Sequence, residues 1–206
     1  MIRYYLAVLI IGKVIKSGSD DYFKEKIESG DITTDFVKPI NYILLLFTRT
    51  VAKIFIYFVG LSFITITVAL LLHINPILSL DHVLYSIVPL LFAFLLGFFV
   101  TTKIGSLHFY FPDLSYFSFL ARDLVIGLLA GITFNLELVT GFFYKIIVLL
   151  PFRYIVNFPV IILTSDIPPD AVVQGLLIQA VWLVICTIGS ILFFKAGLKR
   201  YCAYGG

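Results

Sequence analysis

The sequence predicts an all-α polytopic membrane protein, with a bundle of about five transmembrane helices. Of its 206 residues, 61% are hydrophobic and 13% are charged, whereas a soluble domain is about half apolar and about a quarter charged. The mean hydropathy of +1.07 agrees with this class. The 21 Phe and 12 Tyr residues suit a bilayer protein with rings at the interfaces. A net charge of +3 is too small to indicate binding to nucleic acid.

The first apolar segment, residues 1–16, is too short to cross a bilayer. It holds about 14 apolar residues before a polar stretch, and ~20 are needed to span. "MIRYYLAVLIIGKVIK" has the charge and apolar core of a secretory signal, but it lacks a small-x-small cleavage site. We therefore expect residues 1–16 to be a partial span, the cytoplasmic end of a helix whose beginning is missing.

Residues 17–50 form a polar segment that contains "SDDYFKEKIESGDITTDFVKPIN", with six of the twelve acidic side chains. Ser19 can cap a short helix that Gly30 ends, and Asp31 can cap a second one before Pro39. Apolar residues lie four apart in each: Phe23 with Ile27, and Ile32 with Phe36. Two short amphipathic helices on the cytoplasmic face suit docking into a groove on a soluble partner. A solvated loop lying on the membrane is the alternative.

Four later segments are long enough to cross or nearly cross a bilayer. The first is preceded by an interfacial helix that starts at Pro39, a residue suited to a first helical turn. The third carries Arg122 and Asp123. The last is closed by Lys195, Lys199 and Arg200. These predicted spans are 51–73, 83–102, 116–134 and 171–194.

Residues 135–170 are apolar but broken. "ELVTGFFYKIIVLL" and "YIVNFPVIIL" are each too short to span, and we expect Pro151 and Pro159 to interrupt them. This pattern predicts a re-entrant or interfacial hairpin, because broken backbone is tolerated at membrane depth only under a cover of protein or water. A kinked full span is the alternative.

The placement of Lys and Arg in short loops predicts the orientation. Residues 13–53 hold seven such residues, 74–82 hold none and the tail 195–206 holds three. We therefore expect 17–50, 103–115 and the tail to be cytoplasmic, and 74–82 and the hairpin to be extracellular. Lys145 and Arg153 are exceptions on the outer side. The protein is expected to be multi-pass in the plasma membrane.

No enzyme motif is present: the sequence has no phosphate loop, no H-E-x-x-H and no G-x-S-x-G. Two places carry polar chemistry in apolar surroundings. Arg122 and Asp123 can be a gate facing the bundle interior, or a headgroup-level pair with Arg122 snorkelling. "PFRYIVNFP" can be an extracellular gate or an interfacial anchor. The gate or pathway candidates are Arg122, Asp123, Pro151, Phe152, Arg153 and Pro159.

Three stretches resemble one family. "IESGDITTDFVKPINYIL" is similar to the segment that type-two ABC exporter permeases carry after their second span. "VLLPFRYIVNFPVIIL" and "QAVWLVICTIGSILFFKAGLKRY", with the terminal "YGG", resemble the closing pattern of one branch of these ABC-2 transporters. The resemblance covers nearly the whole chain and is strongest at 27–42 and 149–206. It departs at "GITFNLEL", where the family pattern leads us to expect a proline near Asn135.

The resemblance implies a single permease domain with six spans in the complete fold, of which the first and most of the second are missing here. It implies a separate ATPase subunit that carries ATP and Mg, with no cofactor in this chain, and a second permease subunit of the same or a different kind. The cytoplasmic coupling helix of the family falls on residues 20–37. The coupling candidates are Phe23, Ile27, Gly30, Asp31, Phe36 and Pro39.

The sequence thus favours the permease subunit of an ATP-driven exporter that is itself no ATPase. A non-transporting membrane scaffold or an ion-coupled secondary transporter are the alternatives. Ionisable residues are few in the predicted spans, and ion-coupled carriers usually need them near the midplane.

Overall fold

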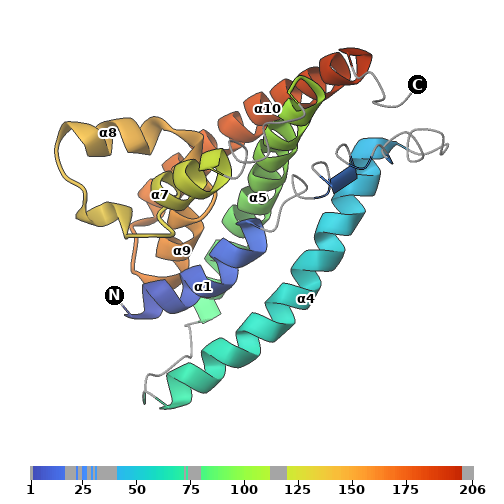
Figure 1. Ribbon diagram of the computed structural model, residues 1–206. Helices are drawn as coiled ribbons and strands as arrows, with labels where there is room; N and C mark the ends of the chain where they lie inside the picture. The colour runs from blue at the N-terminus through green and yellow to red at the C-terminus, as the bar shows by residue number, and fades with distance from the viewer. Residues whose placement is uncertain are drawn as a thin grey trace.

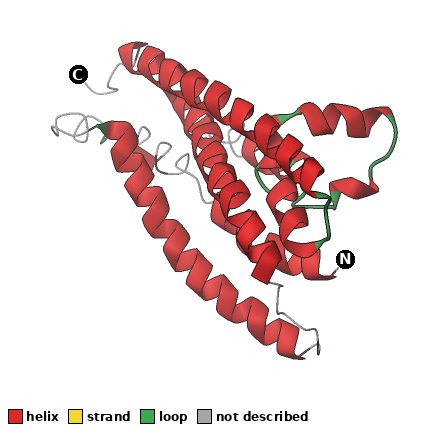
Figure 2. Cartoon of the chain, turned by 180° about the vertical axis from the view of Figure 1, so that it is seen from behind, coloured by secondary structure: helices red, strands yellow, loops and turns green. Residues whose placement is uncertain are grey.

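Helices are the regular elements in the part of the chain that the computed structural model describes (Figure 2). This part comprises residues 2–16, 22, 25–26, 29, 31, 41–71, 73, 80–111 and 120–200. The all-α prediction is therefore confirmed.

Three long helices dominate the architecture: α4 (Tyr42–Leu71), α5 (Leu80–Gly105) and α10 (Pro169–Arg200) (Figure 1). Each is long and apolar enough to cross a membrane. The predicted spans 83–102 and 171–194 lie within α5 and α10, and 51–73 falls on α4, which ends at Leu71. The expected interfacial helix is not separate, because α4 runs without a break from Tyr42 into the span. Pro39 lies outside the described residues.

The N-terminal helix α1 (Ile2–Lys16) is short and packs against α4, α5 and α9. Tyr4, Val8 and Ile11 are its buried residues in the larger of two apolar cores. This core also takes residues from α5, α9 and the segments between them. The partial span predicted for 1–16 is thus a helix built into the bundle.

The third predicted span, 116–134, ends earlier than expected. A π-helix, η2 (Ala121–Ile126), continues into α7 (Gly127–Leu129), and the helix ends at Ala130. The cause is Gly131, whose φ of +81° is left-handed. The chain then turns back so that the N–H groups of Ile132 and Thr133 donate to the Gly127 carbonyl at 3.2 and 3.1 Å. Residues 116–119 lie outside the described part.

Short helices fill residues 136–164: η3 (Leu136–Leu138), α8 (Phe142–Leu149), η4 (Pro151–Tyr154) and α9 (Asn157–Thr164). The chain breaks before Pro151, as predicted. Pro159 does not interrupt the second piece, since it lies in the first turn of α9, where an N–H has no helical acceptor.

This segment folds back on itself. Asn135 and Glu137 at its start line a pocket of ≈ 510 Å³ together with Thr164 and Ser165 at its end. The two ends of the segment therefore meet, as a hairpin requires. Its depth in a bilayer remains a prediction.

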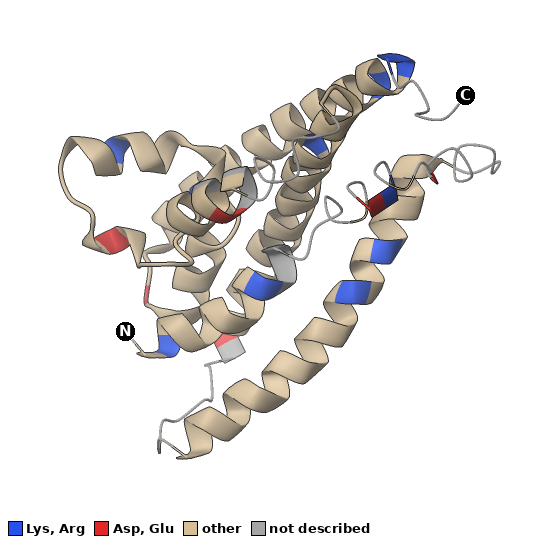
Figure 3. Cartoon of the chain, viewed as in Figure 1, with Lys and Arg blue, Asp and Glu red and all other residues tan. Residues whose placement is uncertain are grey.

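A second, smaller core joins the start of α4 to the ends of α5 and α10. Its buried residues are Tyr42, Leu46, Phe98, Phe109 and Phe194. Lys and Arg residues gather toward this end, on the first half of α4 and the last turn of α10 (Figure 3). The far half of α4 carries no charge. The molecule thus has one basic end and one end where α4 finishes, α5 begins and the N-terminus lies.

Candidate functional site

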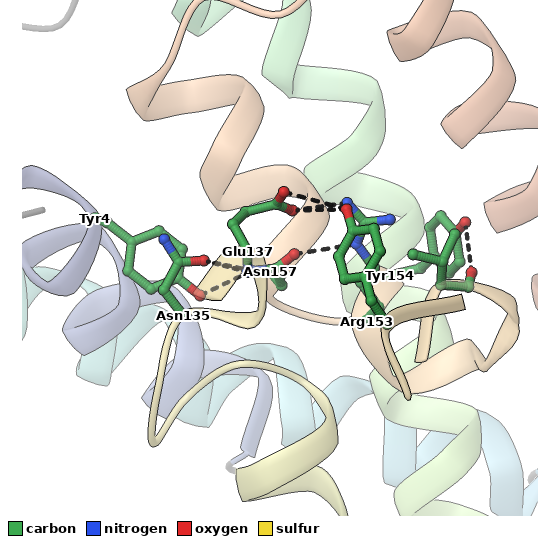
Figure 4. A network of polar contacts seen from close by, with 8 residues as sticks. Tyr4, Asn135, Glu137, Arg153, Tyr154 and Asn157 are labelled. Carbon is green, nitrogen blue, oxygen red and sulfur yellow. Dashed lines mark hydrogen bonds and ion pairs between the residues drawn. The ribbon is translucent and has the colours of Figure 1, made fainter. Parts of the chain in front are cut away.

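Polar side chains converge where the hairpin meets α1, in otherwise apolar surroundings (Figure 4). We call this group the hairpin polar cluster. It consists of Tyr4, Asn135, Glu137, Tyr144, Arg153 and Asn157.

Arg153 is the central charge of the cluster. One guanidinium nitrogen donates to Glu137 Oε1 at 2.9 Å, and its Nε donates to Asn157 Oδ1 at 3.2 Å. Its side chain is only 15% exposed. A charge so far withdrawn from water needs an opposite charge and good hydrogen bonds, and Glu137 supplies the opposite charge. The Arg153–Glu137 pair is therefore neutral as a unit.

Tyr144 extends the pair onto α8. Its hydroxyl donates to Glu137 Oε2 at 3.1 Å, and Arg153 lies 5.5 Å from the centre of its ring. Burial raises the pKa of Tyr144 above its usual value, an effect that the nearby Arg153 opposes. The phenol therefore keeps its proton at neutral pH and acts as a donor.

Asn157 joins the cluster to α1 and is fully buried. Its Nδ2 donates to Tyr4 Oη at 3.0 Å and to Asn135 Oδ1 at 3.4 Å, and its backbone N–H donates to the Ala130 carbonyl at 2.9 Å. Tyr4 in turn donates to the Gly131 carbonyl at 2.8 Å. The turn after α7, the start of α9 and the N-terminal helix are thereby tied together.

Asn135 stands near the place where the family pattern leads us to expect proline. It caps η3, since its Oδ1 accepts from the Glu137 N–H at 3.1 Å. Its φ of −70° is one that proline also adopts. The side chain thus fixes this turn and positions Glu137 for Arg153.

α10 holds the middle of the hairpin from the other side. Gln179, fully buried, donates to the carbonyls of Pro89 and Tyr154 at 2.9 and 3.0 Å. Trp182 donates to the Leu149 carbonyl at 2.9 Å. The bonds to Tyr154 and Leu149 reach carbonyls on either side of the break at Pro151, and the bond to Pro89 ties α10 to α5.

Of the predicted gate residues, the structure places Arg153 at the centre of the cluster. Pro151 is buried at the start of η4, Phe152 packs against the larger core, and Pro159 is buried in α9. The prediction missed Tyr4, Asn135, Glu137 and Tyr144. An isolated polar residue in an apolar stretch was the signal for Glu137 and Asn135.

Asp123 is half-buried in the π-helix η2, outside the hairpin polar cluster. The Arg122 side chain lies outside the described residues. Single π turns are frequent at functional sites. The structure therefore leaves both as candidate gate residues.

The expected coupling segment is described at five residues only: Tyr22, Glu25, Lys26, Ser29 and Asp31. The Ser29 N–H donates to the Glu25 carbonyl at 3.0 Å, as in a helical turn, and Lys26 pairs with Asp31 at 3.6 Å. The Arg49 guanidinium lies over the Tyr22 ring at 4.1 Å. Phe23, Ile27, Gly30, Phe36 and Pro39 lie outside the described residues.

Within the described residues, no three His, Cys, Asp or Glu side chains come close enough to hold a metal ion. His82 and Asp166 form a pair at 3.0 Å between the start of α5 and the connection from α9 to α10. The polar side chains of the described residues therefore form hydrogen bonds and ion pairs with one another.

No curated protein and no solved structure matches the chain. A family model described as "ABC-2 family transporter protein" matches residues 1–205. Permeases of this family are membrane components that work with an ABC ATPase and are not themselves the ATPase. The match spans α1, the polar segment and all three long helices. The resemblance at 27–42 and 149–206 is thereby confirmed, and this chain belongs to the ABC-2 transporter family.

Proposed function

We propose that this chain is the membrane-spanning subunit of an ATP-driven exporter in the plasma membrane. A second permease subunit completes the substrate pathway, and a separate ATPase binds at the basic, cytoplasmic end. The observation that carries this proposal is the family match over residues 1–205, which takes in the polar segment and the long helices as one unit.

The contacts of the polar segment support coupling through it. Tyr22 packs under Arg49 near the start of α4, and α4 is continuous to Leu71. Tyr42 stacks on Phe194 with ring centres 5.6 Å apart, which links α4 to α10. A displacement of residues 20–37 by a bound ATPase would therefore act on two long helices together.

The hairpin supports a gating role on the opposite side. Most of its polar bonds are internal, and Tyr4 is the cluster member supplied by α1. The hairpin can therefore move as a unit when its bonds to α1, through Tyr4, and to α10, through Gln179 and Trp182, break together. Switching between inward- and outward-open pathways would use this junction.

Replacing residues 20–37 by a Gly-Ser stretch of equal length tests the coupling. The tagged chain is purified in mild detergent from its native cells, and the ATPase that accompanies it is identified by its phosphate-loop peptides, purified alone and added back. We expect the replacement to abolish binding of this ATPase, because the amphipathic docking surface is gone.

Lys145→Gln, on the exposed face of α8, is the matched control and should bind the ATPase as the wild type does. Size-exclusion profiles of the variants check that each remains folded. Retained binding by the 20–37 replacement would contradict docking through this segment.

A further inference from the structure

An apolar groove of ≈ 340 Å³ lies between α1, α4 and α5, on the side of α1 away from the hairpin polar cluster. We call it the α1–α4 groove. Its volume falls in the range of roughly 300–1,000 Å³ that ligand sites occupy. Most of its lining is apolar, including Leu6, Ile10, Phe58, Ile66 and Leu90, and Arg3 also lines it.

Two hydroxyls on the walls of the groove already donate their protons within their own helices. Thr65 donates to the Leu61 carbonyl at 2.8 Å, and Ser86 donates to the Val83 carbonyl at 2.9 Å. Neither proton is left for a ligand in the groove. The interior of the groove therefore suits an apolar chain.

Arg3 supplies a positive charge at one end. Lys13 lies over the Tyr57 ring at 5.7 Å, whereas Arg3 lines the groove with Ala69, so α1 runs antiparallel to α4. Arg3 thus stands level with the last turns of α4 and the first turns of α5. Its side chain is exposed and makes no hydrogen bond or ion pair with another described residue.

A carboxylate on the other side of Arg3 is already paired. Glu137 lines the neighbouring pocket of ≈ 510 Å³ with Arg3, but it pairs with Arg153 at 2.9 Å. Arg3 is therefore left to attract an anion. A guanidinium holds phosphate with two parallel hydrogen bonds.

The length of the groove matches one leaflet. Its lining runs from Phe58 to Ala69 on α4, about 16 Å at ~1.5 Å per residue. The hydrocarbon core is ~30 Å thick, so each leaflet is about half of that. A site as deep as one leaflet, apolar inside and cationic at its outer end, has the chemistry of an anionic lipid.

We propose that the α1–α4 groove binds an acyl chain of an anionic phospholipid from the surrounding bilayer, with the headgroup phosphate on Arg3. Its test contains no nucleotide and no partner protein, so the outcome does not depend on the proposed coupling to an ATPase.

Native mass spectrometry of the delipidated full chain tests the site, with phosphatidylglycerol and phosphatidylcholine as probes. We expect phosphatidylglycerol to bind about tenfold more tightly, which is about 1.4 kcal/mol, because the choline ammonium of phosphatidylcholine offsets the charge of its phosphate. Arg3→Gln should bring the two lipids to the same affinity. Ile66→Trp, which fills the groove from an exposed position, should weaken both lipids.

Two variants are matched controls: Arg49→Gln removes an exposed arginine at the other end of α4, and Val184→Trp adds the same bulk on the exposed face of α10. Both should bind like the wild type. Equal binding of the two lipids by the wild type, or an unchanged preference in Arg3→Gln, overturns the proposal. Binding of inorganic phosphate alone in place of the lipid also overturns it, because it would show a free-anion site. Loss of a dimer in Ile66→Trp overturns it too, because it would show an interface between two copies.

Discussion

Asn157 shows how one side chain fixes the junction between hairpin and bundle. It is fully buried, and its amide donates to Tyr4 and Asn135 while its oxygen accepts from Arg153. A buried amide with its hydrogen bonds made costs little, but each partner that is lost leaves a polar group without water. The junction is therefore sensitive to single substitutions.

Arg153→Gln should lower the free energy of unfolding by about 1–3 kcal/mol, because Glu137 loses its charge partner and is itself partly exposed. Arg153→Lys should recover less than half of this, since an ammonium cannot serve Glu137 and Asn157 in the fork geometry of a guanidinium. Thermal denaturation in detergent, followed by the monodisperse fraction, measures both.

Lys145→Gln is the control for loss of a positive charge on the same hairpin. Combining Arg153→Gln with Glu137→Gln gives a double-mutant cycle, in which the two effects should be strongly non-additive. Additive effects would mean that the 2.9 Å pair contributes nothing to stability.

The sequence indicated some of the individual residues of the hairpin polar cluster. "PFRYIVNFP" singled out Arg153 and Asn157 because polar residues are conspicuous between prolines. Tyr4 carried no such signal, since it is one of twelve tyrosines and lies 153 residues before its partner Asn157. A contact at that separation depends on how α1 and α9 pack, which no local pattern encodes.

The middle parts of the long helices were easier to predict from the sequence than the helix ends. Long apolar runs fixed the middle of α4, α5 and α10. The start of α4 was missed although Asn41 marks it, with its Oδ1 accepting from the Ile43 N–H at 3.0 Å. The end of α7 was missed because Gly131 alone turns the chain within an apolar stretch.

The Phe158 ring of α9 packs against the backbone of α10 at Gly175. A methyl group there would overlap the ring of Phe158, whereas a methyl group on Gly60 in α4 would meet no atom within 4 Å. We expect Gly175→Ala to lower the free energy of unfolding by about 1–3 kcal/mol through overpacking. Gly60→Ala should raise it by up to about 1 kcal/mol, because alanine favours helix.

The same detergent denaturation assay compares these two helical glycines. A loss of stability in Gly60→Ala as large as that in Gly175→Ala would show that backbone effects, and not contact with Phe158, set the result.

The helices of the molecule differ in how much of their apolar surface is buried in the larger core. α1, α5, α9 and the middle of α10 share the larger core, while α4 presents many exposed apolar side chains, among them Phe55, Ile56 and Phe63. A surface of this kind suits lipid or a second subunit. The basic end and the hairpin lie apart, as coupling on one side and gating on the other require.

Single cysteines test this division across the membrane in a chain in which Cys186 and Cys202 are replaced by serine. A membrane-impermeant maleimide should label Leu138→Cys and Ser165→Cys in intact cells, because both ends of the hairpin meet at one pocket. Lys199→Cys should react only after permeabilisation, because the placement of Lys and Arg predicts that the basic end faces the cytoplasm. Val59→Cys, exposed in the middle of α4, is the control buried in lipid and should not react in either case. Labelling of Leu138→Cys and Ser165→Cys from opposite sides would show a kinked span, because only a segment that crosses the bilayer separates its two ends.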